Sequence, residues 1–142
     1  MKRRGSLLRL KRFRVDELKR RLATLDEMKL DLEKKLSDLE DSVVRERQRA
    51  NDSDIGRLAF PSFLQSIDVR RKNIKTTMAE LERERSQQQN ELAAAFQDLK
   101  TFEVAEEERV RRAAEAEDRA AQSRLDEMAL VRHLRKHSVR QV

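Results

Sequence analysis

Residues 51–67 read NDSDIGRLAFPSFLQSI, and they contain the strongest interruption of helix in the chain. This stretch holds the only proline, Pro61, and one of the two glycines, Gly56. The Asn, Asp and Ser side chains of residues 51–54 hydrogen-bond their own backbone, and Gly56 is free to take positive φ, so both features compete with helix. Pro61 suits the first turn of a new helix, because its missing N–H has no helical partner there. We therefore predict a helix over about 6–52, a turn at about 53–60 and a second helix over about 61–138.

Upstream of the turn, apolar residues recur at alternating spacings of three and four. From Leu8 to Ala50, ten of the thirteen positions in this series are apolar. Such a sustained 3.5-residue repeat is the seam of a coiled coil, and pairs such as Glu17 with Arg21 support the helix. The series consists of Leu8, Lys11, Val15, Leu18, Leu22, Leu25, Lys29, Leu32, Leu36, Leu39, Val43, Glu46 and Ala50.

Downstream of the turn, the apolar seam continues and then becomes sparse. No Gly or Pro interrupts residues 62–142, which predicts one helix of roughly 75 residues. A helix of that length needs a partner helix for stability in water. The expected seam positions are Phe63 or Leu64, Ile67, Ile74, Met78, Leu81, Leu92, Ala95, Leu99 and Phe102, followed by Val110, Ala114, Ala121, Leu125 and Met128.

A short turn makes the two helices antiparallel neighbours. If the turn is centred near residues 55 and 56, the numbers of facing residues add to about 111. This register places Asp26 near Arg85 and Lys29 near Glu82, where the seams of both helices become polar. A polar layer of this kind fixes register. The same register places a basic N-terminal group alongside an acidic group, namely Arg3, Arg4, Arg9 and Lys11 alongside Glu103, Glu106, Glu107 and Glu108.

The predicted fold is all-α, a single long two-helix antiparallel coiled-coil hairpin over residues 1–142 whose C-terminal helix overhangs. The first helix ends near residue 104 of its partner, so residues 105–142 project beyond the two-stranded part, with only the extreme N-terminus against their base. That segment is small-sided and charged, as in RRAAEAEDRAAQ, so it buries little area and is marginal as an isolated helix. We expect it to be mobile on its own or ordered by a partner.

The composition excludes several other classes of protein. Of the 142 residues, 42% are charged and 4% are aromatic, which cannot fill a conventional globular core. With no Cys, disulfides, thiolate nucleophiles and zinc–thiolate sites are absent. No apolar run is long enough to span a bilayer. Basic residues interrupt the N-terminal apolar segment, so we expect a retained cytoplasmic N-terminus rather than a signal peptide.

No arrangement of residues predicts catalysis. The sequence has no recognisable nucleophile, base and acid set and no phosphate-binding glycine loop, so we expect no enzymatic activity and no cofactor. His133 and His137 stand at i and i+4, a spacing that can chelate zinc. Basic neighbours repel cations there, so we interpret the pair as solvated and expect no metal.

Two surfaces remain open to interpretation. Residues 1–21 carry ten Lys or Arg against two acidic residues. This basic end is solvated or internally paired, or it binds an acidic protein, or it binds nucleic acid or a membrane. At the turn, Phe60 and Phe63 either cap the seam or belong to a docking site. The tip has five large apolar residues within ten positions, more than a two-helix tip can turn inward, so we expect at least one to stay exposed. They are Leu58, Phe60, Phe63, Leu64 and Ile67.

The whole arrangement resembles the FliJ family of flagellar export proteins and their virulence-type secretion counterparts. The resemblance covers essentially the full chain. It includes the basic N-terminal LLRLKRFRVDELKRRLATL, the hairpin tip AFPSFLQSI and the C-terminal RLDEMALVRHLR, which looks like the family's closing Leu-Asp-Glu-x-Ala element. The tip carries Phe60 and Phe63 where the family often has Tyr.

The resemblance implies a coiled coil similar to the central stalk of rotary ATPases. It implies as partners the hexameric export ATPase, the cytoplasmic domain of the export gate and empty export chaperones, with peripheral association at the cytoplasmic face of the inner membrane through these partners. We expect a monomer when the protein is free, and nucleic acid is not an expected partner. The hypothesised partner-binding residues are Arg3, Arg4, Arg9, Lys11, Arg12, Phe60, Phe63, Leu64, Leu125, Asp126 and Glu127. The alternatives are a generic structural coiled coil, dimerising in parallel through residues 18–43, and a basic protein that binds nucleic acid or membrane surfaces.

Overall fold

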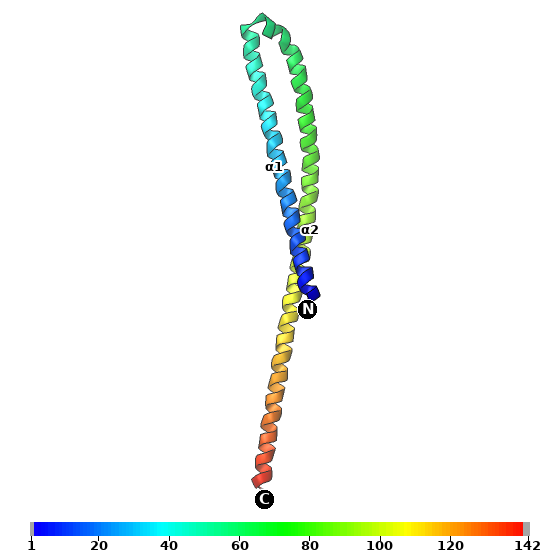
Figure 1. The fold of residues 1–142 in the computed structure, drawn as a ribbon, viewed down its shortest axis with the longest axis vertical. Coiled ribbons are helices and arrows are strands. Elements are labelled where there is room, and N and C mark those ends of the chain that lie inside the picture. The colour runs from blue at the N-terminus through cyan, green and yellow to red at the C-terminus, as the bar shows by residue number, and fades with distance from the viewer. Residues whose placement is uncertain (1, 141–142) are drawn as a thin grey trace. The chain divides into compact units, whose positions relative to one another are not determined.

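The computed structural model describes residues 2–140, and side chains over residues 3–139. It consists of two long helices, α1 (Lys2–Asp52) and α2 (Asp54–Arg140). The chain divides into two compact units, Met1–Gln97 and Asp98–Val142. Within the first unit, α1 and the first part of α2 run side by side in opposite directions (Figure 1). The predicted all-α antiparallel hairpin is confirmed.

The turn is shorter than predicted. Ser53 is the only non-helical residue in the described part of the chain, and α2 begins at Asp54 rather than near residue 61. The Ser53 hydroxyl accepts a hydrogen bond from the Gly56 N–H at 3.2 Å, and its carbonyl accepts one from the Arg57 N–H at 3.0 Å. This is the geometry of an N-cap, and Asp54 adds favourable negative charge to the first turn. The N-cap therefore starts the helix two turns before the proline.

Pro61 consequently lies inside α2 instead of at its start. A proline at this position has no N–H to donate to the carbonyl four residues earlier, on Arg57, and its ring favours a kink. The first part of α2 crosses the tip of the hairpin, and the helix then bends before it runs back along α1 (Figure 1). A proline inside a helix favours a kink, which is compatible with a chain reversal made within α2.

Gly56 has a different role from the predicted one. No residue in the described part of the chain has positive φ, glycines included. Instead, a Cβ on Gly56 would lie 2.7 Å from the carbonyl oxygen of Arg49 and 3.2 Å from the backbone nitrogen of Ala50. The next residue, Arg57, donates from Nε to the Ala50 carbonyl at 3.5 Å, which caps the end of α1. Gly56 is therefore required for close approach of the two backbones.

The seam predicted for α1 is confirmed. All thirteen positions of the three-and-four series are buried or half-buried, including the polar Lys11, Lys29 and Glu46. Leu18 and Ile67 are the largest fully buried side chains in the described residues. Because the buried positions repeat every 3.5 residues, α1 presents a coiled-coil seam along one side, with polar residues at three of its positions.

On α2, the first unit buries the predicted apolar positions together with polar ones that the sequence did not indicate. Phe63, Leu64, Ile67 and Leu81 are half-buried or buried. The other predicted seam positions of this unit are half-buried as well, namely Ile74, Met78, Leu92 and Ala95. The unexpected half-buried residues are Arg71, Arg85, Gln88 and Glu91.

Two of these polar residues pair across the helices in the predicted register. Arg85 Nε donates to Asp26 Oδ1 at 2.6 Å, as expected from the sequence. Arg71 donates from Nε and Nη2 to the two carboxylate oxygens of Glu40, at 2.6 and 2.8 Å. Both pairs have residue numbers that add to about 111. Glu82 instead contacts Arg85 of its own helix, Oε1 to Nη1 at 3.9 Å, so the polar layer is centred on Asp26 and Arg85 rather than on Lys29 and Glu82.

In the second unit, α2 is stabilised by ion pairs along its own surface. Glu108 accepts hydrogen bonds from Arg111 and, at 3.1 Å, from Arg112, and these bonds hold its carboxyl pKa below the ordinary value. Arg124 lies 3.3 Å from Glu117. Such pairs one or two turns apart support a helix without burying apolar surface. The predicted overhang and the predicted pairing of the basic N-terminus with the acidic cluster stay predictions.

Candidate partner-binding surfaces

The described residues contain no cluster of metal-ligating side chains. In residues 2–140 no group of three or more His, Cys, Asp or Glu side chains could hold a metal ion. His133 and His137 are exposed, with ring centroids 4.5 Å apart in an edge-to-face arrangement. Candidate functional sites are therefore surfaces that expose apolar side chains, and three of these occur.

The first surface is the tip patch, formed by Ile55 and Leu58. These side chains are 81% and 83% exposed, the highest values for large apolar residues in the described part of the chain. Phe60, Phe63 and Leu64 are half-buried, and the Arg47 guanidinium lies 6.0 Å from the centre of the Phe60 ring. The expected apolar surplus at the tip therefore exists. It consists of Leu58, which the sequence indicated, and Ile55, which it did not.

Sequence reasoning missed Ile55 because it assigned residues 53–60 to a turn. With Ser53 as N-cap, Ile55 lies in the first turn of α2, on the outer side of the tip. The available signal was the spacing of Ser53, Asp54 and Gly56, which matches an N-cap followed by its first helical turn. Partner contacts of Phe60, Phe63 and Leu64 stay a prediction.

The second surface, the N-terminal face, is formed by Leu7, Leu10 and Phe13 of α1. All three side chains are exposed, whereas Val15 and Leu18 are buried in the seam. Arg3 and Ser6 line a shallow depression together with Leu7 and Leu10. Among the basic residues proposed for partner binding, Arg3, Arg4, Arg9 and Arg12 are exposed and Lys11 is half-buried on the seam.

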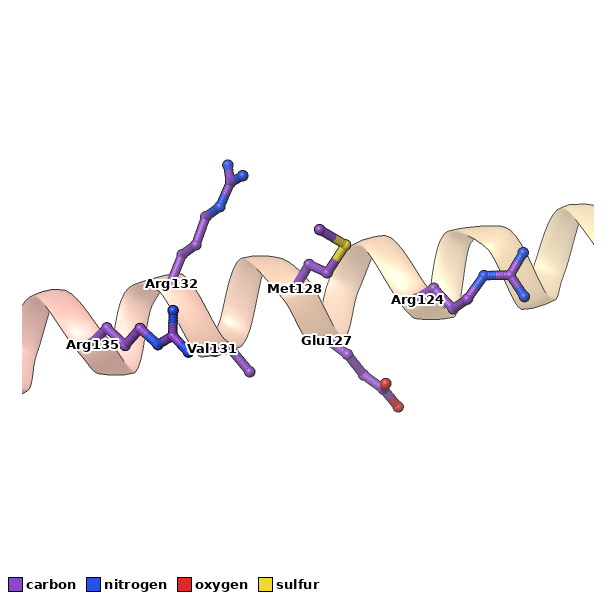
Figure 2. Close-up of a pocket in the computed structure, with 6 residues that line it drawn as sticks. All are labelled: Arg124, Glu127, Met128, Val131, Arg132 and Arg135. Atoms are coloured by element: carbon purple, nitrogen blue, oxygen red, sulfur yellow. The ribbon is translucent and has the colours of Figure 1, made fainter.

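The third surface, the C-terminal face, lies within the second unit. Its residues line a hollow along one side of α2: Arg124, Glu127, Met128, Val131, Arg132 and Arg135. Figure 2 shows the exposed Met128 and Val131 between Arg124 on one side and the other two arginines on the other. Of the predicted residues here, Leu125 is exposed, Asp126 accepts a hydrogen bond from Gln122 at 3.1 Å, and Glu127 borders the hollow.

The second unit buries its seam only near its start, where Leu99 is buried and Phe102 half-buried, and from residue 110 onward it exposes nearly all of it. Of the positions predicted from the sequence, Val110, Ala114, Leu125 and Met128 are exposed, and Ala121 is half-buried. Every Val, Leu and Met from residue 110 to residue 139 is exposed. A helix with so little buried surface gains no stability from packing.

No helix in the described part of the chain is both long enough and apolar enough to cross a membrane. In a comparison with protein families, the model for the family described as "Flagellar FliJ protein" matches residues 1–138. No curated protein and no solved structure matched the chain.

Proposed function

Because the chain belongs to the FliJ family of flagellar proteins, we propose that it is a non-enzymatic coiled-coil component of flagellar type III protein export. In this proposal it acts as a stalk-like partner of the hexameric export ATPase, links that ATPase to the cytoplasmic domain of the export gate and escorts empty export chaperones. It is a monomer when free, because the first unit buries its seam within one chain. It lies at the cytoplasmic face of the inner membrane through these partners.

The observation that carries the proposal is the exposure of apolar side chains in the second unit. Residues 110–139 expose all of their Val, Leu and Met side chains. A helix of this composition is marginal alone, so a partner that covers it stabilises both the helix and the complex. Met128 and Val131, flanked by arginines, have the character of an interface centre with a polar rim. We assign the ATPase contact to this C-terminal face.

The tip patch suits the second partner in the proposal. Ile55 and Leu58 are the most exposed large apolar side chains described, and they lie at the end of the hairpin opposite the chain termini of the first unit. Exposed apolar patches on an otherwise charged surface favour protein docking. We assign the gate contact to the tip patch.

The test is co-purification of the full chain with the export ATPase, with the ATPase rate measured with and without it. The variant Met128→Ser with Val131→Ser should weaken binding about tenfold or more, because two apolar residues at an interface centre are lost. The matched control is Met28→Ser with Val44→Ser, which changes an exposed methionine and an exposed valine of α1 in the first unit.

Two results would count against the proposal. If the unmodified chain neither binds the ATPase nor changes its rate, the stalk function is wrong. If the control weakens binding as much as the Met128 and Val131 variant, the C-terminal face is not the contact.

A further inference from the structure

The first four turns of α1 carry apolar side chains on two separate sides. Leu8, Val15 and Leu18 belong to the seam and are half-buried or buried. Leu7, Leu10 and Phe13 lie at successive spacings of three and are exposed. These three form a short apolar row along one side of the helix that the hairpin does not cover.

Positive charge surrounds this row. Residues 1–21 carry ten Lys or Arg against Asp16 and Glu17. Arg3 lines the same depression as Leu7 and Leu10. One helical turn away, Arg14 lies 3.7 Å from Glu17 and 3.7 Å from Glu91, so its charge is partly balanced. Arg9 is exposed, and its Nε donates to the Gly5 carbonyl at 3.4 Å.

From this arrangement we propose that the N-terminal face binds directly to bilayers that contain anionic phospholipid. Leu7, Leu10 and Phe13 enter the headgroup region, and the surrounding arginines contact lipid phosphates. A helix with a short apolar row and excess positive charge is typical of a protein that lies on a membrane surface. This contact differs from the proposed function, in which membrane association runs through partner proteins.

The spacing of the row favours a bilayer over the other acidic partners. A helix that docks in a protein groove carries apolar anchors at i, i+3, i+4 and i+7, but the i+4 and i+7 positions after Leu7 are Lys11 and Arg14. A nucleic acid is bound through phosphate contacts that make no use of three exposed apolar side chains. A bilayer accepts both the short row and the charge.

The experiment is flotation of the full chain, with its native N-terminus, together with phospholipid vesicles. One set of vesicles contains phosphatidylcholine alone, and the other contains phosphatidylcholine mixed with phosphatidylglycerol. We expect binding to the mixed vesicles only, and weaker binding as NaCl is raised, because salt screens the attraction to the lipid charge.

The informative variant is Leu10→Ser with Phe13→Ser, whose side chains are 62% and 57% exposed. Losing this apolar contact should lower the vesicle partition coefficient about tenfold or more. Leu30→Ser with Val44→Ser is the matched control, because these side chains are 64% and 56% exposed and lie elsewhere on α1. The control should bind like the unmodified chain, and circular dichroism should show equal helix in all three proteins.

Several outcomes would overturn the lipid proposal. One is that the unmodified chain does not bind the mixed vesicles. Another is that the Leu10 and Phe13 variant binds them as well as the control does. If the unmodified chain does not bind vesicles and the same variant weakens binding to the export ATPase, the face binds protein. If the variant instead weakens binding to duplex DNA, the face binds nucleic acid. Retained ATPase binding without vesicle binding would reject the lipid contact and leave the proposed function intact.

Discussion

The two units of this chain share the helix α2 but differ in where their side chains find partners. In Met1–Gln97, ion pairs cross from one helix to the other, as between Arg71 and Glu40, and apolar seam residues such as Leu18 are buried. In residues 108–127, the described ion pairs stay within one helix, and Leu125 and its apolar neighbours are exposed. The first unit is therefore stabilised by its own contacts, whereas the second has an unoccupied apolar surface.

This difference shows that the tendency of a sequence to form a helix is separate from its ability to pack against a second helix. The described residues of both units are helical, apart from Ser53 at the tip, and both units have abundant charge and helix-supporting pairs. Only the first has large apolar residues at most seam positions, so only it gains the hydrophobic free energy that holds two helices together. Substitutions at equivalent positions in the two units should consequently have unequal effects.

The largest difference is expected between Leu18 and Leu125, which are 0% and 60% exposed. Leu18→Ala should lower the free energy of unfolding by about 3 kcal/mol, because it removes buried apolar surface and leaves a cavity. Leu125→Ala should change it by less than about 0.5 kcal/mol. Urea denaturation followed by far-UV circular dichroism measures both. Equal effects would mean that the two units do not differ in packing.

A smaller contrast is expected between the two glycines. Gly56→Ala should destabilise the hairpin by about 2 kcal/mol, because the new Cβ meets the rigid backbone of Arg49 at 2.7 Å. Gly5→Ala has open space around its Cβ and should be neutral or stabilise α1 by up to about 1 kcal/mol, since alanine favours helix. Thermal unfolding of both variants tests this. A tolerated Gly56→Ala would show that the tip relaxes readily.

The smallest effect on stability is expected from removing one charge pair, and it is expected at acidic pH. Hydrogen bonds from Arg71 hold the pKa of Glu40 below its ordinary value of 4.5. Because the unfolded carboxyl is protonated first, the pair's contribution is fully present above about pH 4.5 and is lost as the pH falls through the folded pKa. Glu40→Gln should therefore make the acid-dependent loss of hairpin stability shallower.

Glu108→Gln provides the control for this acid effect. The pKa of Glu108 is also lowered, by hydrogen bonds from Arg111 and Arg112, but these lie on the same helix in the second unit. This variant should reduce helix locally and leave the hairpin unchanged. Hydrogen exchange of peptides from each unit, measured as the pH is lowered, separates the two effects. An equal loss of hairpin protection in both variants would contradict this interpretation.

Periodicity predicted much of the hairpin from the sequence. A seam spacing of three and four depends only on which side of a helix is buried, so Leu18 and Val43 were placed correctly. The register also followed, because a short turn fixes which residues face each other, and Asp26 indeed pairs with Arg85. Both inferences depend on the regular geometry of the coiled coil, which is the same at every seam position.

The tip was predicted less well because single residues decide it. Pro61 and Ser53 both favour a helix start, and the sequence does not show which signal is stronger. The need for Gly56 arises from an approach to Arg49 that depends on the tertiary packing. In the second unit, periodicity correctly indicated a sparse seam, but the exposed Met128 and Val131 do not by themselves identify what covers them.

The one-residue connection at Ser53 has a mechanical consequence. Sliding one helix along the other by a heptad is a displacement of about 10 Å. The tip has one non-helical residue, and Gly56 lies against the backbone of Arg49. The connection is therefore too short to allow this displacement unless a turn of helix unwinds. The two helices of the hairpin are therefore held in a single register by the tip. A force applied along one helix is transmitted to the other.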